Sequence, residues 1–534
     1  MNEPHSPESP EIPSRSTSLT PDPTVAGAKD TTAEASNHLK TDHLLKDLGH
    51  RTVSAGFVTA GAQFVNFFIF LGGTFALSRL LTPQDFGLVA MTGSLMSILR
   101  VFREGGLSTA TIQTEGITEA QVSNLFWINL AFGTLITLIG VALSPVVAWF
   151  YRDSRLTLIT MLLSLSFAFG AIAVQHLALL NRQMRFKAIA AIDITSALVG
   201  LVAGTLCAWY GLGYWSLVGM QLSMAASEMV LTWSASGWRP QLPKRRSGTK
   251  PLLQFGASMT AYILLRRVTA GADTIFLGRF YSADVVGLYS RAGALLFRPL
   301  LQVISPFDRV FVPTLSRLQS QPARYRQIFI QVHSTIIMLG FALTGLFLGL
   351  CQPLVLVVLG AKWVETIPIF AWFSIGALAI PLSYPAIWLP TTQGRNRDLL
   401  TMGTIVPIIT VISVVAGIPF GATGMAMITS LTGLLICVPI QFHYTGRSGP
   451  VSRRDLWYLF FRHLPLWAAV VVATGLVRQA LISFSPLAQL VAGGIAGGLA
   501  AVVVIACIPS LRQDALYLID RLKKFVQRPP ATAP

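Results

Sequence analysis

The sequence predicts an all-α polytopic membrane protein with about 14 transmembrane helices, and at least about 12. Of its 534 residues, 53% are hydrophobic and only 12% are charged, whereas a soluble domain carries about 25% charged residues. The apolar residues lie in runs of about 20, long enough for a helix to cross ~30 Å of hydrocarbon. Backbone polar groups in lipid must be bonded within their own segment, and the alternation typical of a membrane β-barrel is absent from these runs. The runs are therefore interpreted as helices.

The elements follow in order along the chain. Residues 1–50 are rich in Ser, Thr, Pro and Glu and contain no apolar run, which predicts a disordered cytoplasmic tail. Apolar spans and basic breaks then predict the following segments: a six-helix lobe at 51–238, a basic linker at 239–250, a second six-helix lobe at 251–446, an appended pair of helices at 447–511, and a cytoplasmic tail at 512–534. The expected span centres are Phe67, Leu95, Phe132, Phe167, Ala197, Leu222, Leu265, Leu300, Leu343, Ala377, Val411, Ile428, Val470 and Ala496.

The net charge of +17 does not indicate nucleic acid, because the basic residues gather in alternate short loops. The rich loops hold Arg100, Arg103, Arg182, Arg185, Lys187, Arg239, Lys244, Arg245, Arg246, Lys250, Arg317, Arg324, Arg326, Arg395, Arg397, Arg447, Arg453 and Arg454. The poor loops hold Arg79, Arg152, Arg155, Arg279, Lys362 and Arg478. Basic residues stay on the cytoplasmic side of short loops, so both termini are predicted to be cytoplasmic.

An internal repeat supports the two lobes. The segment from Thr74 to Leu88 aligns without gaps with the segment from Thr274 to Leu288. The identical pairs are Thr74/Thr274, Leu77/Leu277, Arg79/Arg279, Gly87/Gly287 and Leu88/Leu288. Both copies close the first span of a six-span half, so the halves point the same way across the membrane. Parallel repeats of this kind are a transporter architecture with the pathway between the halves.

Ionisable residues inside the spans mark the candidate site, because such groups normally face a cavity. Arg266 and Arg267 lie in the seventh span, and Arg291 and Arg298 share one stripe of the eighth. Guanidinium groups stay charged when buried and bind phosphate through forked hydrogen bonds. We expect at least two of these four arginines to line an anion-binding cavity that holds a diphosphate. In the alternative, Arg291 and Arg309 snorkel to the interfaces and Arg266 pairs with Asp273 as a structural tie.

Three carboxylates at membrane depth are candidates for proton or sodium coupling: Asp193, Glu228 and Asp273. Asp193 and Glu228 could equally be hydrogen-bonded helix contacts. The cysteines are isolated in apolar stretches without the spacing of metal ligands, and the histidines are single. No metal site, no cofactor and no catalytic residues are expected.

Four segments stand out along the chain: Leu80-Leu-Thr-Pro-Gln-Asp-Phe-Gly-Leu-Val-Ala, Asp273-Thr-Ile-Phe-Leu-Gly-Arg-Phe, Val286-Gly-Leu-Tyr-Ser-Arg-Ala and Phe311-Val-Pro-Thr-Leu-Ser. They resemble signatures of the polysaccharide flippases, in the branch of lipopolysaccharide and colanic-acid exporters of the multidrug/oligosaccharidyl-lipid/polysaccharide exporter superfamily. The resemblance covers about residues 50 to 450. It implies two six-helix lobes around a central cavity. It also implies a cargo of oligosaccharide on undecaprenyl diphosphate, moved from the inner to the outer leaflet of the bacterial cytoplasmic membrane.

Two other functions are open on the sequence. A drug/cation antiporter of the same superfamily predicts a cavity rich in carboxylates and aromatics, whereas the deep arginines outnumber the nearby Asp273. A membrane polysaccharide polymerase or ligase needs a large outer loop with catalytic residues, and the loops are short, so the protein is expected not to be an enzyme. The expected partners are the lipid-linked oligosaccharide, membrane lipids and other polysaccharide-assembly proteins, without nucleic acid.

Overall fold

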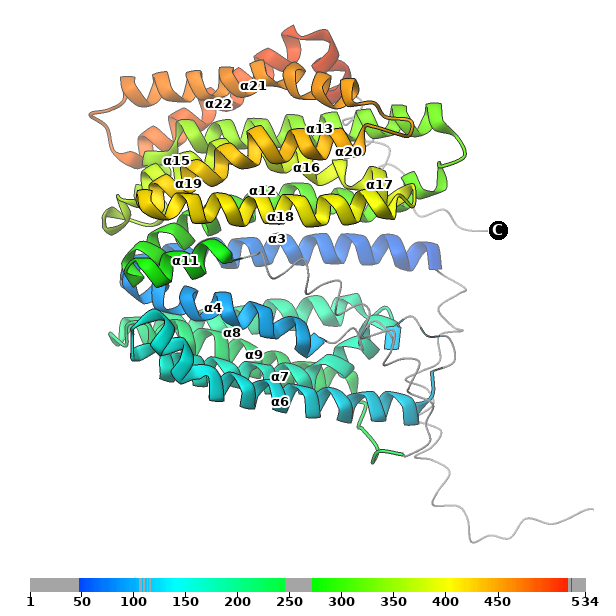
Figure 1. Cartoon of the computed structure of the whole chain (residues 1–534), viewed down its shortest axis with the longest axis vertical. Coiled ribbons are helices and arrows are strands. Elements are labelled where there is room, and N and C mark those ends of the chain that lie inside the picture. The colour runs from blue at the N-terminus through cyan, green and yellow to red at the C-terminus, as the bar shows by residue number, and fades with distance from the viewer. Residues whose placement is uncertain are drawn as a thin grey trace, which may run out of the picture.

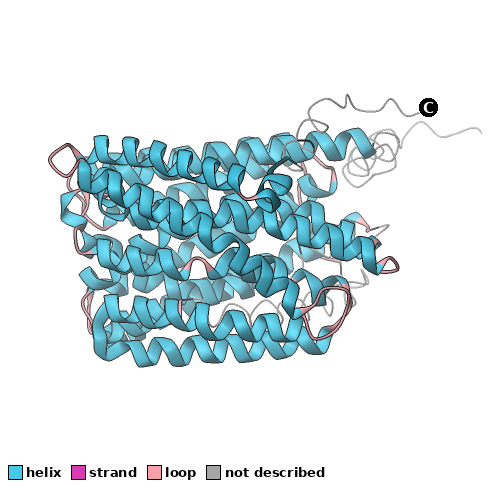
Figure 2. Cartoon of the chain, turned by 90° about the horizontal axis from the view of Figure 1, so that it is seen from above, coloured by secondary structure: helices cyan, strands magenta, loops and turns pink. Residues whose placement is uncertain are grey.

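A computed structural model describes residues 48–104, 108, 111–112, 114, 117–244, 271–516 and 520. All regular secondary structure in these residues is helical (Figure 2). The helices run alongside one another, and the loops gather at the two ends of the bundle (Figure 2). We call one of them the Thr82 end, because it holds the turn between the first two helices at residues 81–82.

The first half of the bundle contains six long helices, drawn in blue to cyan-green (Figure 1). They are α3 (Leu48–Leu80), α4 (Pro83–Glu104), α6 (Glu119–Tyr151), α7 (Arg155–Arg182), α8 (Phe186–Trp209) and α9 (Trp215–Ser236). Helix α6 begins with a capping box, in which Thr118 and Gln121 satisfy each other's backbone N–H groups. Helix α3 packs on α8, and α8 packs on α9.

The second half begins with α11 (Ala272–Phe280) and α12 (Ala283–Arg317), and shorter pieces follow (Figure 1). These are α13 (Pro322–Gly349), α14 (Cys351–Val358), η1 (Ala361–Trp363), α15 (Thr366–Gly376), α16 (Ala379–Ala386), α17 (Trp388–Thr392), α18 (Asn396–Gly417), η2 (Ile418–Phe420), α19 (Gly421–Thr432), η3 (Gly433–Cys437) and α20 (Val438–Thr445). Prolines explain part of this fragmentation, since each removes a backbone donor from the helix ladder. Helix α12 nevertheless continues through Pro299 and Pro306.

Helices α21 (Arg453–Ala480) and α22 (Pro486–Cys507) form an antiparallel pair at one edge of the molecule (Figure 1). Helix α21 packs along α13, and α22 packs along α21 and α14. The pair lies on the far side of the second half from α3 (Figure 1). Its position leaves it outside the contact between the two halves.

The all-α membrane fold predicted from the sequence is confirmed. Within the described residues, nine helical stretches are long and apolar enough to cross a membrane. One of them, residues 396–445, holds two predicted centres, Val411 and Ile428, in a hairpin that turns at η2. Helix α12 is not among the nine, because its charged residues lower its hydropathy. The predicted centre Leu265 lies outside the described residues. The number of spans and the domain boundaries stay predictions.

The two halves meet at the Thr82 end through α4 and α12. Buried residues from both helices belong to one apolar core, among them Leu88 of α4 and Val286 and Leu295 of α12. The indole of Trp363, itself fully buried, donates a 2.9 Å hydrogen bond to the carbonyl of Ser78. The guanidinium of Arg79 donates a 2.9 Å hydrogen bond to the carbonyl of Val357. These contacts close the Thr82 end between the halves.

Candidate functional site

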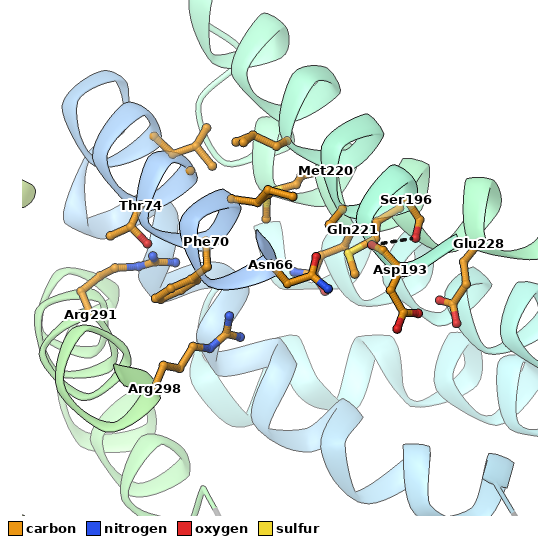
Figure 3. A pocket seen from close by; sticks show the side chains of 16 residues that line it. Asn66, Phe70, Thr74, Asp193, Ser196, Met220, Gln221, Glu228, Arg291 and Arg298 are labelled. Atoms are coloured by element: carbon orange, nitrogen blue, oxygen red, sulfur yellow. Dashed lines mark hydrogen bonds between the residues drawn. The ribbon is translucent and has the colours of Figure 1, made fainter. Parts of the chain in front are cut away.

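A cavity of about 450 Å³ lies between the halves, with walls from α3, α8, α9 and α12 (Figure 3). That volume is within the range of small-molecule sites. The wall from α3 is the longest, running from Asn66 to Leu77, which is about 16 Å of helix axis. The polar side chains on the wall are Asn66, Thr74, Asp193, Ser196, Gln221, Glu228, Arg291 and Arg298.

Arginines form one side of this cavity. Arg291 and Arg298 are seven residues apart on α12, so they share a helix face, and both line the cavity (Figure 3). The Arg291 guanidinium carbon lies 3.7 Å from the ring centre of Phe86 on α4. The Arg298 guanidinium carbon lies 4.3 Å from the ring centre of Phe70 on α3. Both of these arginines of the second half therefore stack on a phenylalanine of the first half.

No carboxylate among the described residues forms an ion pair with Arg291 or Arg298. Stacking on an aromatic face stabilises a cation by about 0.5–2 kcal/mol without using its N–H donors. The Arg298 side chain is exposed and Arg291 is half-buried. Two guanidinium groups with free donors beside a cavity are suited to binding an anion through charge-assisted hydrogen bonds.

Carboxylates form the other side of the cavity. Asp193 of α8 and Glu228 of α9 line it opposite α12, with Asn66 and Phe70 of α3 between the two sides (Figure 3). The exposed Asp193 lies one turn from Ser196, whose hydroxyl bonds the backbone of its own helix. The sequence did not bring these carboxylates and the arginines together, because they come from helices distant along the chain.

A second cavity of about 370 Å³ adjoins the first and lies toward the end of the bundle opposite Thr82. It shares Asn66 and Asp193 with the first cavity. Its other polar wall residues are Thr59 and Gln63 of α3 and Asn181 of α7. The two cavities together form a route that begins among hydroxyl and amide groups and reaches the arginines.

Of the remaining predicted site residues, the structure describes Asp273, which is not on the wall of this cavity. Arg266 and Arg267 lie outside the described residues. Asp273 lies in the first turn of α11 and accepts hydrogen bonds from the Thr274 backbone N–H at 2.7 Å and from the Thr274 hydroxyl at 3.3 Å. Within the described residues, no group of three His, Cys, Asp or Glu side chains could hold a metal ion. Ion coupling by Asp193, Glu228 or Asp273 stays a prediction.

Several wall residues were missed from the sequence, notably Asn66, Phe70, Thr74 and Gln221. Asn66 and Gln63 are polar residues inside the first apolar span, and polar groups at membrane depth are expensive enough to indicate a cavity. That signal was present in the sequence. Phe70 carried none, because a phenylalanine facing lipid and one facing an arginine look alike in an apolar run.

A helical membrane bundle of two halves with a charged cavity between them has the architecture of a transporter. The chain belongs to the polysaccharide biosynthesis protein family, whose sequence profile matches residues 76–368. This agrees with the predicted flippase family and with the expectation that the protein is a transporter and not an enzyme.

Relatives with assigned names agree with the family. The chain is 23% identical to the succinoglycan biosynthesis transport protein ExoT of Rhizobium meliloti, over 80% of this chain and 87% of that protein. It is 23% identical to the lipopolysaccharide biosynthesis protein WzxC of Escherichia coli, over 76% and 83%. It is 25% identical to the teichuronic acid biosynthesis protein TuaB of Bacillus subtilis, over 54% of this chain and 60% of that protein.

Solved structures share the fold. The inward closed conformation of the lipid II flippase MurJ matches 85% of this chain and 99% of that one, with a TM-score of 0.65 at 12% identity. The inward-facing conformation of a multidrug resistance transporter of the MATE family matches 76% of this chain and 99% of that one, with a TM-score of 0.56 at 12% identity. At such identities the likeness concerns the fold, and the cargo must be argued from the cavity.

Proposed function

We propose that the protein is a flippase that moves an undecaprenyl-diphosphate-linked oligosaccharide from the inner to the outer leaflet of the bacterial cytoplasmic membrane. The observation that carries the proposal is the pair Arg291 and Arg298, which line the cavity between the halves without a carboxylate partner among the described residues. Their free donors suit the diphosphate of a lipid carrier. The family and its relatives in polysaccharide biosynthesis support a carrier-linked glycan as the cargo.

Orientation follows from the loop charges. The described arginine-rich loops, which hold Arg182, Arg317 and Arg395, lie at the end opposite Thr82. Under the positive-inside rule that end faces the cytoplasm, with both termini on the same side. The second cavity then lies toward the cytoplasm, where the lipid-linked oligosaccharide is made. The closed Thr82 end faces outward. This arrangement corresponds to a transporter that is ready to bind its cargo from the cytoplasmic side. Other polysaccharide-assembly proteins would act on the cargo after its release on the outer side.

The test is deletion of the gene in its host, followed by complementation at matched membrane expression. We expect the deletion strain to lose surface glycan and to accumulate its lipid-linked precursor. Wild type should restore the glycan, and Arg298→Ala should lower it by about a hundredfold. Arg317→Ala is the matched control, because Arg317 ends the same helix, is exposed and does not line the cavity. Unchanged surface glycan after deletion would refute the proposal.

A drug/cation antiporter is the second candidate, and the placement of Asp193 and Glu228 on the cavity wall favours it. Carboxylates in a cavity attract organic cations. The two functions differ in which charged residues of the cavity transport requires: the carboxylates for an antiporter of cations, and the arginines for a flippase. An antiporter should lose export of a fluorescent cation such as ethidium when Asp193→Asn is introduced and keep it with Arg298→Ala, whereas a flippase should export no ethidium at all.

A further inference from the structure

The charges in the cavity are arranged along the membrane normal. Arg298 lies about 22 Å of helix axis from the start of α12 at the Thr82 end, near the middle of the bundle. Asp193 lies about 10 Å of helix axis from the start of α8, and Glu228 lies about 12 Å from the end of α9. Both of these helix ends are at the end of the bundle opposite Thr82. A cargo that loads from that end therefore passes the carboxylates before its anionic group reaches the arginines.

Polar uncharged groups surround the carboxylates. Thr59, Gln63, Asn66 and Asn181 line the second cavity beside Asp193. Gln221 lines the first cavity two helical turns from Glu228, on the same face of α9. The amide oxygen of Asn66, in the wall that the two cavities share, is buried and has no hydrogen-bond partner among the described residues. A buried unpaired acceptor costs about 1–3 kcal/mol, so Asn66 is a polar residue of this wall that the described fold leaves unsatisfied.

Hydroxyl donors fit this wall. Carboxylate and amide oxygens accept hydrogen bonds from sugar hydroxyl, acetamido N–H or ammonium groups. A uronic acid would instead bring a second carboxylate next to Asp193 and Glu228, and like charges brought together in a site cost several kcal/mol.

Resting on the proposed function, we propose that Asp193, Glu228 and Asn66 form a glycan subsite that holds the sugar next to the diphosphate, and that this subsite selects a neutral or amino sugar over an acidic one. The arginines bind the diphosphate of every carrier. The carboxylates discriminate among carriers by the charge of the first sugar. Discrimination by repulsion is a common way to achieve specificity when the attractive contacts are shared.

The test uses the full-length protein in lipid nanodiscs and three soluble probes: farnesyl diphosphate, farnesyl diphosphate carrying glucose, and farnesyl diphosphate carrying glucuronic acid. Affinity is measured by microscale thermophoresis. We expect wild type to bind the glucose probe at least about tenfold more tightly than the glucuronic acid probe. In the double variant Asp193→Asn, Glu228→Gln this ratio should fall to within about twofold. Bare farnesyl diphosphate should bind at least as tightly as in wild type, because two negative charges leave the cavity wall. Both substitutions are isosteric, so binding of the bare probe also reports that the variant is folded.

Two controls separate this inference from the proposed function. Arg298→Ala should weaken all three probes and keep the preference for glucose. Glu119→Gln, a carboxylate at the start of α6 outside both cavities, should change nothing. Equal affinity of wild type for the two sugar probes would overturn the subsite, as would a preference that survives in the double variant. Two other outcomes would instead contradict the diphosphate site of the proposed function. One is that wild type does not bind bare farnesyl diphosphate, and the other is that Arg298→Ala binds it as tightly as wild type.

Discussion

Gly87 of α4 and Gly287 of α12 contact each other's helices reciprocally at the Thr82 end. A Cβ atom on Gly87 would overlap the carbonyl oxygen of Ala283, and one on Gly287 would overlap the carbonyl oxygen of Pro83. The two glycines are equivalent positions of the internal repeat. Small residues let helix backbones approach closely, and here they close the contact between the halves. The repeat therefore places one glycine on each side of the same contact.

Gly87→Leu should hold the Thr82 end apart, because a side chain cannot fit against the Ala283 backbone. We expect glycan export to fall at least about tenfold, since overpacking of this kind costs about 1–3 kcal/mol. A cysteine at Thr74, on the cavity wall, should become reactive toward a membrane-impermeant maleimide added from outside, in a background where Cys207, Cys351, Cys437 and Cys507 are replaced by alanine.

Gly93→Leu is the matched control on the same helix, because no atom of the described residues lies within 4 Å of a Cβ placed there. It should leave both export and labelling close to wild type. Equal behaviour of the two variants, or unchanged labelling in Gly87→Leu, would show that the glycine contact does not close this end.

Phe70→Leu should weaken diphosphate binding by about two- to fivefold, because it removes the aromatic face, worth about 0.5–1 kcal/mol, that orients the Arg298 guanidinium. The measurement is the affinity of farnesyl diphosphate in nanodiscs. Phe68→Leu, two residues away on α3, is the control, since Phe68 is 55% exposed and stacks only with Phe64 and Phe67 among the described rings. An affinity unchanged by Phe70→Leu would mean that the stacking does not orient Arg298.

Asp514→Asn should lower the free energy of unfolding by about 3 kcal/mol, because it leaves the enclosed Arg462 without its counterion. The Asp514 carboxylate lies 2.5 Å from both the Arg462 guanidinium and the Ser334 hydroxyl, which in turn lies 3.0 Å from His463. Unfolding in detergent is the measurement. The cluster lies on α13, α21 and the segment after α22, away from the cavity, so export measured at matched folded protein should be unaffected.

Two comparisons sharpen that prediction. The double variant Arg462→Met, Asp514→Leu should recover most of the lost stability, because it buries no unpaired charge. Arg326→Met, which breaks a pair whose arginine is 50% exposed, should cost less than about 1 kcal/mol. If Asp514→Asn unfolds like wild type, the ion pair contributes nothing to the docking of this segment.

Dissipating the membrane potential should slow export. Carrying an anion out of a negative cytoplasm releases about 2.3 kcal/mol per charge per 100 mV, so a diphosphate with about two charges gains about 4–5 kcal/mol. The gain requires that Arg291 and Arg298 stay with the protein while the cargo leaves. The measurement is the initial flipping rate in proteoliposomes with valinomycin, compared between an outward potassium gradient, which makes the interior negative, and equal potassium, which sets the potential to zero. A rate that does not depend on the potential would rule this contribution out.

Much of the fold follows from local features of the sequence. Of the predicted span centres, thirteen are described, and all but Ala377, in the short turn between α15 and α16, lie in helices. Run length fixes where a helix can cross a bilayer, and this is a local property. The stripe of Arg291 and Arg298 was equally local, since residues seven apart on a helix share a face. Both arginines line the cavity.

The residues that stack on those arginines or share their cavity could not be predicted in the same way. Phe70, Phe86, Asp193 and Glu228 come from four helices, and their meeting depends on how each helix is rotated about its axis. In a soluble protein the apolar stripe of a helix reveals that rotation. In a membrane protein both the lipid-facing and the protein-facing sides of a helix are apolar, so the hydrophobic pattern does not reveal how the helix is rotated about its axis.

The sequence by itself determined that this is a helical membrane protein, where most of its helices run, and that its second half carries arginines within a membrane-spanning helix. Only the tertiary structure decided that these arginines stack on phenylalanines of the first half, that two carboxylates share their cavity, and that two repeated glycines close one end. The reason is physical. Hydrophobic length and loop charge act on each segment separately, whereas a binding site arises from packing between segments far apart along the chain.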